Sequence, residues 1–154
     1  MNVSITRADE SRLDECRQVF EDSPLYERYF AEPGRLETQL AIAVERGELW
    51  IALSSSSEVV GAMWIELHGF FGAFPYLSLL GVKKRFQGMG VGRTLLSTFA
   101  GVSKRLGYRK CSLLVGDFNV RARNLYQSMG YKRVGHVTDC ILPGLHESIM
   151  VKDL

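Results

Sequence analysis

A glycine-rich segment between an apolar strand and an amphipathic helix constrains the fold more than any other feature. Residues 87–92 read QGMGVG, directly after the apolar run Tyr76–Val82 and before a helical pattern over Gly90–Leu106. A second buried run, Cys111–Val115, follows that helix. A strand, a helix and a further strand in this order form a crossover unit whose two strands lie parallel. The segment therefore predicts an α/β fold.

Shorter apolar patterns surround this unit and complete a mixed sheet. Alternation and helical spacing predict strand Val3–Thr6, a helix from Asp9 or Ser11 to Phe20, a helix after Gly34 that stops at Gly47, strands Leu49–Leu53 and Val59–Leu67, a loop over Gly69–Pro75, a helix over Val120–Met129, and strands Tyr131–Ile141 and Glu147–Val151. This order indicates a central mixed sheet of about seven strands with helices on both faces.

Length and charge exclude several classes of protein. The 154 residues suffice for one sizeable core, so we expect a single domain over residues 1–154. A content of 46% hydrophobic and 23% charged residues excludes a disordered tail, a collagen-like fibre and a disulfide-dense mini-protein. The net charge of +2 is too small to predict nucleic acid or a membrane as a partner.

Cysteine usage and the termini bear on the compartment. Cys16, Cys111 and Cys140 lie far apart in the sequence, as expected for small buried hydrophobic residues in a reducing environment. The first residues lack the pattern of a signal peptide, and the apolar run Phe70–Val82 is too short to span a bilayer. We therefore expect a cytoplasmic protein.

The glycine-rich segment has the composition of a phosphate-binding loop. Glycines permit close approach of the backbone to a ligand, and the start of the next helix presents free N–H groups and a positive dipole. Lys83, Lys84, Arg85 and Arg93 add positive charge around it. The spacing fits neither a P-loop nor a dinucleotide-binding fingerprint. An alternative is that the glycines only allow the strand and helix to pack tightly.

A second motif follows the strand Cys111–Val115. Residues 119–131 read NVRARNLYQSMGY, with Asn119 placed to cap a helix and Ala122, Leu125 and Tyr126 on one face of it. An ordinary capped helix with a core tyrosine would explain these residues equally well.

The two motifs together resemble those of the GNAT superfamily of acyl-CoA-dependent N-acyltransferases. Residues 82–92, VKKRFQGMGVG, are similar to its pyrophosphate motif, and residues 119–131 to its second conserved segment. The resemblance implies a V-shaped splay between the fourth and fifth strands. It also implies transfer of an acetyl group from acetyl-CoA to a primary amine, on a small molecule, peptide or protein, by direct attack in a ternary complex. No metal is required, and a monomer or homodimer is expected.

The resemblance also implies a role for individual residues. Those expected to bind the cofactor are Leu80, Val82, Gln87, Gly88, Met89, Gly90, Val91, Gly92, Arg93, Asn119, Ala122 and Tyr126. The Leu80 N–H would polarise the thioester carbonyl, Asn119 would bond the pantetheine arm, and Tyr126 would protonate the departing thiolate.

The sequence departs from the family pattern at the proton acceptor and before the loop. The strand at Tyr76 lacks the carboxylate that many members use, so Glu66 is the expected catalytic base. His68, or ordered water beside a merely solvated Glu66, are the alternatives. Lys83-Lys84-Arg85 stands where relatives have acidic sequence, and would bind the 3′-phosphate of coenzyme A or form a solvated turn.

The resemblance implies that the acceptor amine binds between the first two helices and the loop that joins the third and fourth strands. Tyr26, Tyr29, Phe30, Phe70, Phe71 and Phe74 occur beside carboxylates such as Glu27 and Glu32. This combination suits a cationic amine with an apolar body, although the same residues could cap the core. A competing function is a regulatory module that binds acyl-CoA without turnover. A nucleotide-binding domain is a third and remote option.

Overall fold

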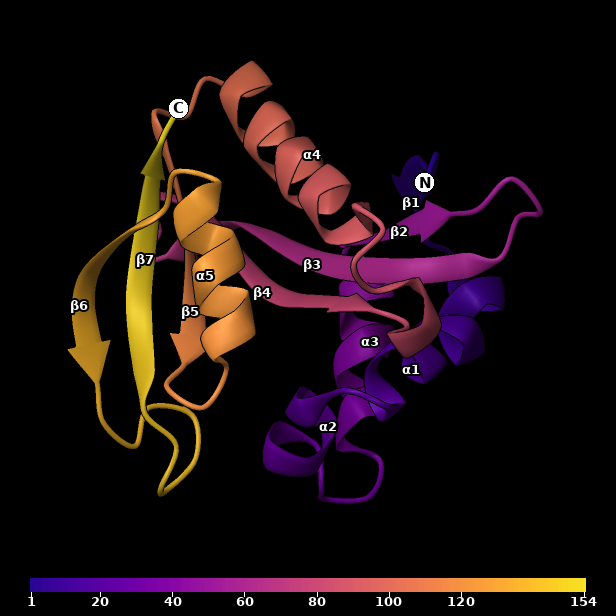
Figure 1. Ribbon diagram of the computed structural model, residues 1–154, viewed down its shortest axis with the longest axis horizontal. Coiled ribbons are helices and arrows are strands. Elements are labelled where there is room, and N and C mark those ends of the chain that lie inside the picture. Colours follow the sequence, from indigo (N-terminus) through magenta and orange to yellow (C-terminus); the bar gives the residue numbers. More distant parts are fainter. The chain divides into compact units, whose positions relative to one another are not determined.

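The computed structural model describes residues 1–154, and Figure 1 labels its elements. In chain order they are β1 (Ser4–Arg7), η1 (Glu10–Arg12), α1 (Leu13–Glu21), α2 (Pro24–Tyr29), α3 (Arg35–Glu45), β2 (Leu49–Leu53), β3 (Val59–Phe70), β4 (Phe74–Val82), η2 (Lys84–Phe86), α4 (Val91–Arg105), β5 (Lys110–Gly116), α5 (Val120–Ser128), β6 (Lys132–Val137) and β7 (Glu147–Asp153). None of the helices has the length and apolar composition that a membrane crossing requires.

The strands form one mixed sheet in the order β1-β2-β3-β4-β5-β7-β6, which confirms the predicted architecture. β4 and β5 are parallel, as the crossover through α4 requires, whereas β5–β7 and β6–β7 are antiparallel. The pairing of β4 with β5 comprises Tyr76 opposite Ser112 and Leu77 opposite Leu113. Beyond these two pairs β4 continues to Val82 and β5 to Gly116.

The chain divides into two compact units. The first contains residues 1–65 and 79–98, and the second contains residues 66–78 and 99–154. β3, β4 and α4 each begin in one unit and end in the other. The expectation of a single domain over residues 1–154 stays a prediction, which a single cooperative unfolding transition would support.

The first unit is built around a core that α1 and α3 share with β2 and β3. Cys16, Phe20, Leu36 and Leu40 are almost fully buried in this cluster. A Cβ on Gly81 of β4 would lie 2.6 Å from Cε1 of Phe20, so the absence of a side chain there lets α1 pack directly on the strand. Asp9 begins the first helical turn, because its carboxylate accepts a hydrogen bond from the Ser11 N–H at 2.9 Å.

The second unit is built on β5, with β7 beside it and β6 at the edge (Figure 1). The Ser112 hydroxyl donates to the Pro75 carbonyl at 2.9 Å, which ties β5 to the start of β4. Cys111 and Met150 are fully buried. The thiol of Cys111 lies 3.4 Å from the Tyr131 hydroxyl.

Three elements and one cysteine differ from the sequence-based expectation. No helix was expected over Pro24–Tyr29, where the structure has α2. Pro24 is the first residue of α2, a position where its missing N–H costs nothing. The expected loop over Gly69–Pro75 is a tight hairpin between β3 and β4, because β3 extends to Phe70. The strand expected over Tyr131–Ile141 ends at Val137. Cys140 is exposed rather than buried, while Cys16 and Cys111 are buried as expected, and all three are free thiols.

Candidate functional site

The glycine-rich loop, in the first unit, has the backbone conformation that only glycine adopts easily. Gly88 has φ of +78° and Gly90 has φ of +89°, both in the left-handed region. A Cβ at either position would meet no atom within 4 Å. Tight internal packing is therefore not the reason for these two glycines. They bend the chain and leave its backbone open.

α4 starts immediately after this bend, and its first turn is held firmly. Val91 and Leu95 are buried, and they pack against Gly61 of β3, where a Cβ would lie 3.1 Å from Val91 and 3.0 Å from Leu95. The Thr94 N–H and hydroxyl both bond to the Gly90 carbonyl, at 3.0 and 3.1 Å. The first N–H groups of α4 have no acceptor within the helix. The arrangement can bind an anion there.

Leu80 and Val82 lie at the end of β4, directly before the loop. The Lys83 N–H donates to the Val60 carbonyl of β3 at 2.9 Å. Since successive residues of a strand direct their main-chain groups to opposite edges, those of Leu80 and Val82 point away from β3. The Val82 carbonyl accepts a hydrogen bond from the Gln87 side-chain amide at 3.1 Å, which anchors the start of the loop.

The basic residues around the loop are not equivalent. Lys83 and Arg85 both bond to the carboxylate of Glu58. Lys84 and Arg93 are exposed. The side chain of Met89 is also partly exposed, at 48%. Lys83 and Arg85 are therefore paired with Glu58, an acid that lies outside the sequence motif.

Asn119, in the second unit, caps α5. Its side-chain oxygen accepts a hydrogen bond from the Ala122 N–H at 3.2 Å, and its own N–H donates to the Gly116 carbonyl at 2.9 Å. The cap therefore accounts for Asn119 and for the Ala122 amide. The two side-chain N–H groups of the Asn119 amide are not used by the cap.

Tyr126 is buried in α5, with 8% of its surface exposed. Its ring packs edge-on against Tyr131, with 6.0 Å between ring centroids. Burial raises the pKa of Tyr126 above its ordinary value, because the phenolate would lose its hydration. The hydroxyl is thus neutral at physiological pH and can donate a proton or hydrogen bond.

Glu66 lies beside Tyr76, a residue that sequence reasoning did not single out. Both side chains cover Gly69, where a Cβ would lie 3.0 Å from Glu66 Cβ and 2.7 Å from Tyr76 Cβ. Burial raises the pKa of Tyr76, and the charges of Glu66 and Glu147 add to the shift, as does Tyr126. Glu66 and Tyr76 therefore lie next to each other in the second unit.

Glu147 is a second residue that sequence reasoning missed. It begins β7 opposite Gly116, and it is the only charged side chain that is buried, with 1% of its surface exposed. An acid at the start of an otherwise apolar strand was its only signal in the sequence. His68, the alternative base, is exposed, and its Nδ1 lies 3.3 Å from the Tyr108 hydroxyl.

The expected acceptor residues have different environments. Phe30 is buried in the core of the first unit, and Tyr26 and Tyr29 pack against that core, as the core-cap alternative predicted. In the second unit Phe70 and Phe74 stack at 4.4 Å between ring centroids. Phe71, at the tip of the same hairpin, is 91% exposed. Of these aromatic residues, only Phe71 presents nearly its whole side chain to solvent.

Comparison with known proteins decides the family. Residues 9–131 match the Acetyltransferase (GNAT) family, and this range contains both motifs. The chain belongs to this family. GNAT proteins are acyltransferases that use acyl-CoA. The open glycine loop at the start of α4 has a geometry that suits the phosphates of such a ligand. Among curated proteins, no sequence matches this chain.

Solved structures share the fold of this GNAT protein over nearly its whole length. Ard1 from Thermoplasma volcanium has a TM-score of 0.81 at 16% identity and covers 100% of this chain and 99% of its own. A GNAT-family acetyltransferase from Bacillus cereus ATCC 10987 has 0.78 at 18%, covering 99% and 98%. The NatC complex bound to Gag peptide and CoA has 0.77 at 18%, covering 100% and 99%. These likenesses are to the fold.

Proposed function

We propose that this protein transfers an acetyl group from acetyl-CoA to a primary amine by direct attack in a ternary complex. The observation that carries the proposal is the open loop of Gly88 and Gly90 at the start of α4, in a chain of the GNAT family. The N–H groups from Gly88 to Arg93 bind the pyrophosphate, because a helix start and a glycine bend together attract anions.

The proposal assigns the acyl-pantetheine arm to β4. Its amides pair with main-chain groups of Leu80 and Val82, which point away from β3. Because the Val82 carbonyl accepts from the Gln87 side chain, the proposed partners are the Leu80 groups and the Val82 N–H. The Leu80 N–H then polarises the thioester carbonyl and stabilises the oxyanion that forms on attack. The side-chain N–H groups of Asn119 bind the same arm while its oxygen caps α5.

The chemical step needs alignment and one proton donor. The amine nitrogen attacks the thioester carbon, a C–N bond forms, and the C–S bond breaks as its electron pair returns to sulfur. Tyr126 donates its hydroxyl proton to that sulfur, and the raised pKa of this buried phenol keeps it protonated until the thiolate forms. Glu66 accepts the proton that the amine loses, directly or through water.

We further propose that the enzyme acts in the cytoplasm as a monomer or homodimer. Its acceptor is a small-molecule amine or an amine of a peptide or protein. A primary amine is protonated in solution and must lose a proton before it can attack. The carboxylate of Glu66, beside Tyr76, would attract this protonated amine.

Release of free thiol from acetyl-CoA, measured over a panel of amines and peptides, tests the proposed function. We expect release with at least one acceptor class and formation of the matching N-acetyl product. Stabilisation by coenzyme A without transfer to any acceptor would favour the regulatory module instead. Greater stabilisation by ATP or NAD than by coenzyme A would contradict an acyl-CoA site.

A further inference from the structure

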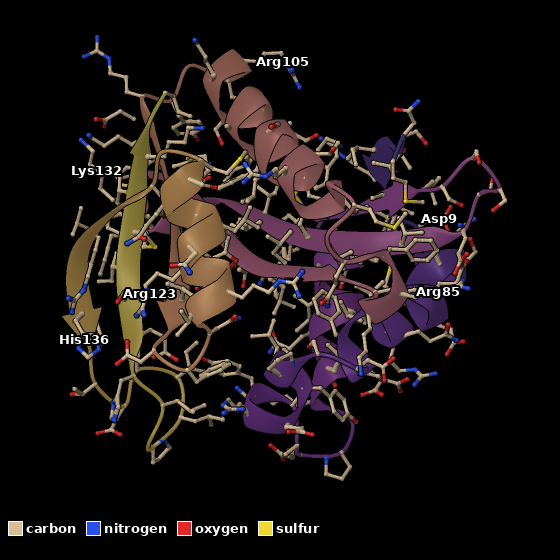
Figure 2. All side chains as sticks on the ribbon, in the orientation of Figure 1. Asp9, Arg85, Arg105, Arg123, Lys132 and His136 are labelled. Carbon is tan, nitrogen blue, oxygen red and sulfur yellow. The ribbon has the colours of Figure 1, made fainter.

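The turn between β2 and β3 holds a carboxylate against the start of the glycine-rich loop. Oε1 of Glu58 lies 3.2 Å from Nζ of Lys83 and also accepts a hydrogen bond from the Arg85 guanidinium. Figure 2 labels Arg85 beside the segment that leads into α4. One acid, distant in sequence, thus bonds two of the cations that surround the loop.

The turn fixes the position of Glu58 without help from these cations. The Glu58 N–H donates to the Ser54 hydroxyl at 3.1 Å, and the Ser54 N–H donates to the Glu58 carbonyl at 2.9 Å. The Arg12 guanidinium bonds to the Ser57 carbonyl at 2.6 Å. The carboxylate is therefore anchored through its own backbone.

The two cations retain donors for another anion. Arginine has five N–H donors and an ammonium has three, and Glu58 occupies a single donor atom of each side chain. Arg85 is 68% exposed and lies over the Phe86 ring at 4.7 Å, whereas Lys83 is only 16% exposed. Arg85 is thus the more accessible of the two to a ligand phosphate.

Glu58 changes the net charge of this group of three side chains. The hydrogen bonds from Arg85 and then Lys83 hold the pKa of Glu58 below its usual range, so the carboxylate is ionised at neutral pH. With Glu58 the group has a net charge of +1, and without it the two cations would present +2.

We propose that Glu58 limits the affinity of the loop for the 3′-phosphate of coenzyme A by cancelling one of the charges of Lys83 and Arg85. The inference rests on the proposed function, since coenzyme A is the ligand. It makes Glu58 a residue that sets cofactor affinity through its neighbours rather than one that touches the reacting atoms. Product coenzyme A, which carries the same phosphates as acetyl-CoA, is released more readily as a result.

The test is a calorimetric titration of wild-type protein and Glu58→Gln with coenzyme A and with 3′-dephospho-coenzyme A. We expect Glu58→Gln to bind coenzyme A about threefold more tightly at low ionic strength, the size expected for one added charge several ångströms from a phosphate near the surface. The gain should be smaller with the dephosphorylated ligand and should shrink in about 0.5 M salt.

Two further variants separate this effect from general changes. Glu45→Gln removes an equal charge from the exposed end of α3 in the same unit, and we expect it to bind both ligands as the wild type does. Arg85→Gln should weaken coenzyme A binding about threefold and reduce the preference over the dephosphorylated ligand. Circular dichroism verifies that each variant is folded.

The outcomes distinguish this inference from the proposed function. If the wild type binds coenzyme A and Glu58→Gln binds it equally well or more weakly, the inference is overturned. Weaker binding would show instead that Glu58 orients Lys83 and Arg85 for the ligand. If neither protein binds coenzyme A, the proposed function and the inference both fail. A gain of the same size for both ligands would also overturn the role of the 3′-phosphate.

Discussion

The two motif regions of this protein, which we propose bind the same cofactor, are built in opposite ways. The loop of Gly88 and Gly90 offers backbone and almost no side chain. The segment from Asn119 to Tyr126 offers side chains on a helix whose first turn is capped by Asn119 through the Ala122 N–H. The first region can therefore be damaged by adding atoms, and the second by removing a single polar group.

Removal of the Tyr126 hydroxyl should have the largest effect among changes in the segment from Asn119 to Tyr126. We expect Tyr126→Phe to lower kcat about a hundredfold, the lower end of general-acid contributions, with little change in the KM for acetyl-CoA. Steady-state kinetics by thiol release provide the measurement. Tyr108→Phe, in a half-buried tyrosine whose hydroxyl lies 3.3 Å from His68 Nδ1, is the matched control. Full activity of Tyr126→Phe at every pH would remove this residue from the mechanism.

Gly81→Ala tests whether β4, the strand that leads into the glycine-rich loop, tolerates an added methyl group. The new Cβ would lie 2.6 Å from Phe20 Cε1 and 2.9 Å from its Cδ1, so a rigid ring or the strand must move. We expect the free energy of unfolding to fall by about 2 kcal/mol, measured by urea denaturation. Gly101→Ala, where the added atom meets only Arg105 at 3.5 Å, should cost little. Equal stability of the two variants would show that α1 can shift freely.

Gly90→Ala tests the loop itself. A Cβ meets no atom there, but φ of +89° is strained for alanine by about 1–2 kcal/mol. We expect coenzyme A to bind roughly tenfold more weakly, by calorimetry, because the loop relaxes away from the binding conformation. Gly144→Ala, at φ of +82° in the β6–β7 connection, carries a similar strain as a control. Equal loss of affinity in both variants would contradict a specific role for the loop.

Asn119→Ala should have the smallest effect on stability and a separable effect on the cofactor. Removing the cap costs about 1 kcal/mol, visible as a lower urea midpoint. Asn119→Asp keeps an oxygen acceptor for the Ala122 N–H but lacks amide N–H donors. We expect it to retain stability and lose acetyl-CoA affinity. Unchanged affinity in Asn119→Asp would restrict Asn119 to the cap.

Elements with strong periodicity were predictable from the sequence, and turns were less so. β2 matches its expected bounds, and α4 and β5 differ from theirs by a single residue at each end. α2 was missed because Pro24 reads equally as the end of one helix and the start of another. The β3–β4 hairpin was read as a loop because its glycines and aromatic residues carry no alternation.

The candidate site also contains parts that the sequence predicted and parts that it did not. The glycine loop, its helix, and Asn119 and Tyr126 belong to two motifs that are each local in sequence, so the resemblance of these motifs to the GNAT family pointed to them. Glu58 bonds to Lys83 and Arg85, and Glu66 lies beside Tyr76, so both groups join residues from separate segments of the chain. No pattern along the chain marks such pairs.

The sequence by itself determined the order of most elements, because backbone preference and hydrophobic periodicity act over a few neighbouring residues. Its two motifs pointed to the family by resemblance. Only the tertiary structure decided which carboxylates stand beside the loop cations and beside Tyr76. It also decided that Phe30 lies in the core while Phe71 is exposed. Electrostatic pairing and burial depend on distance in space, which strand order and register establish after the local structure has formed.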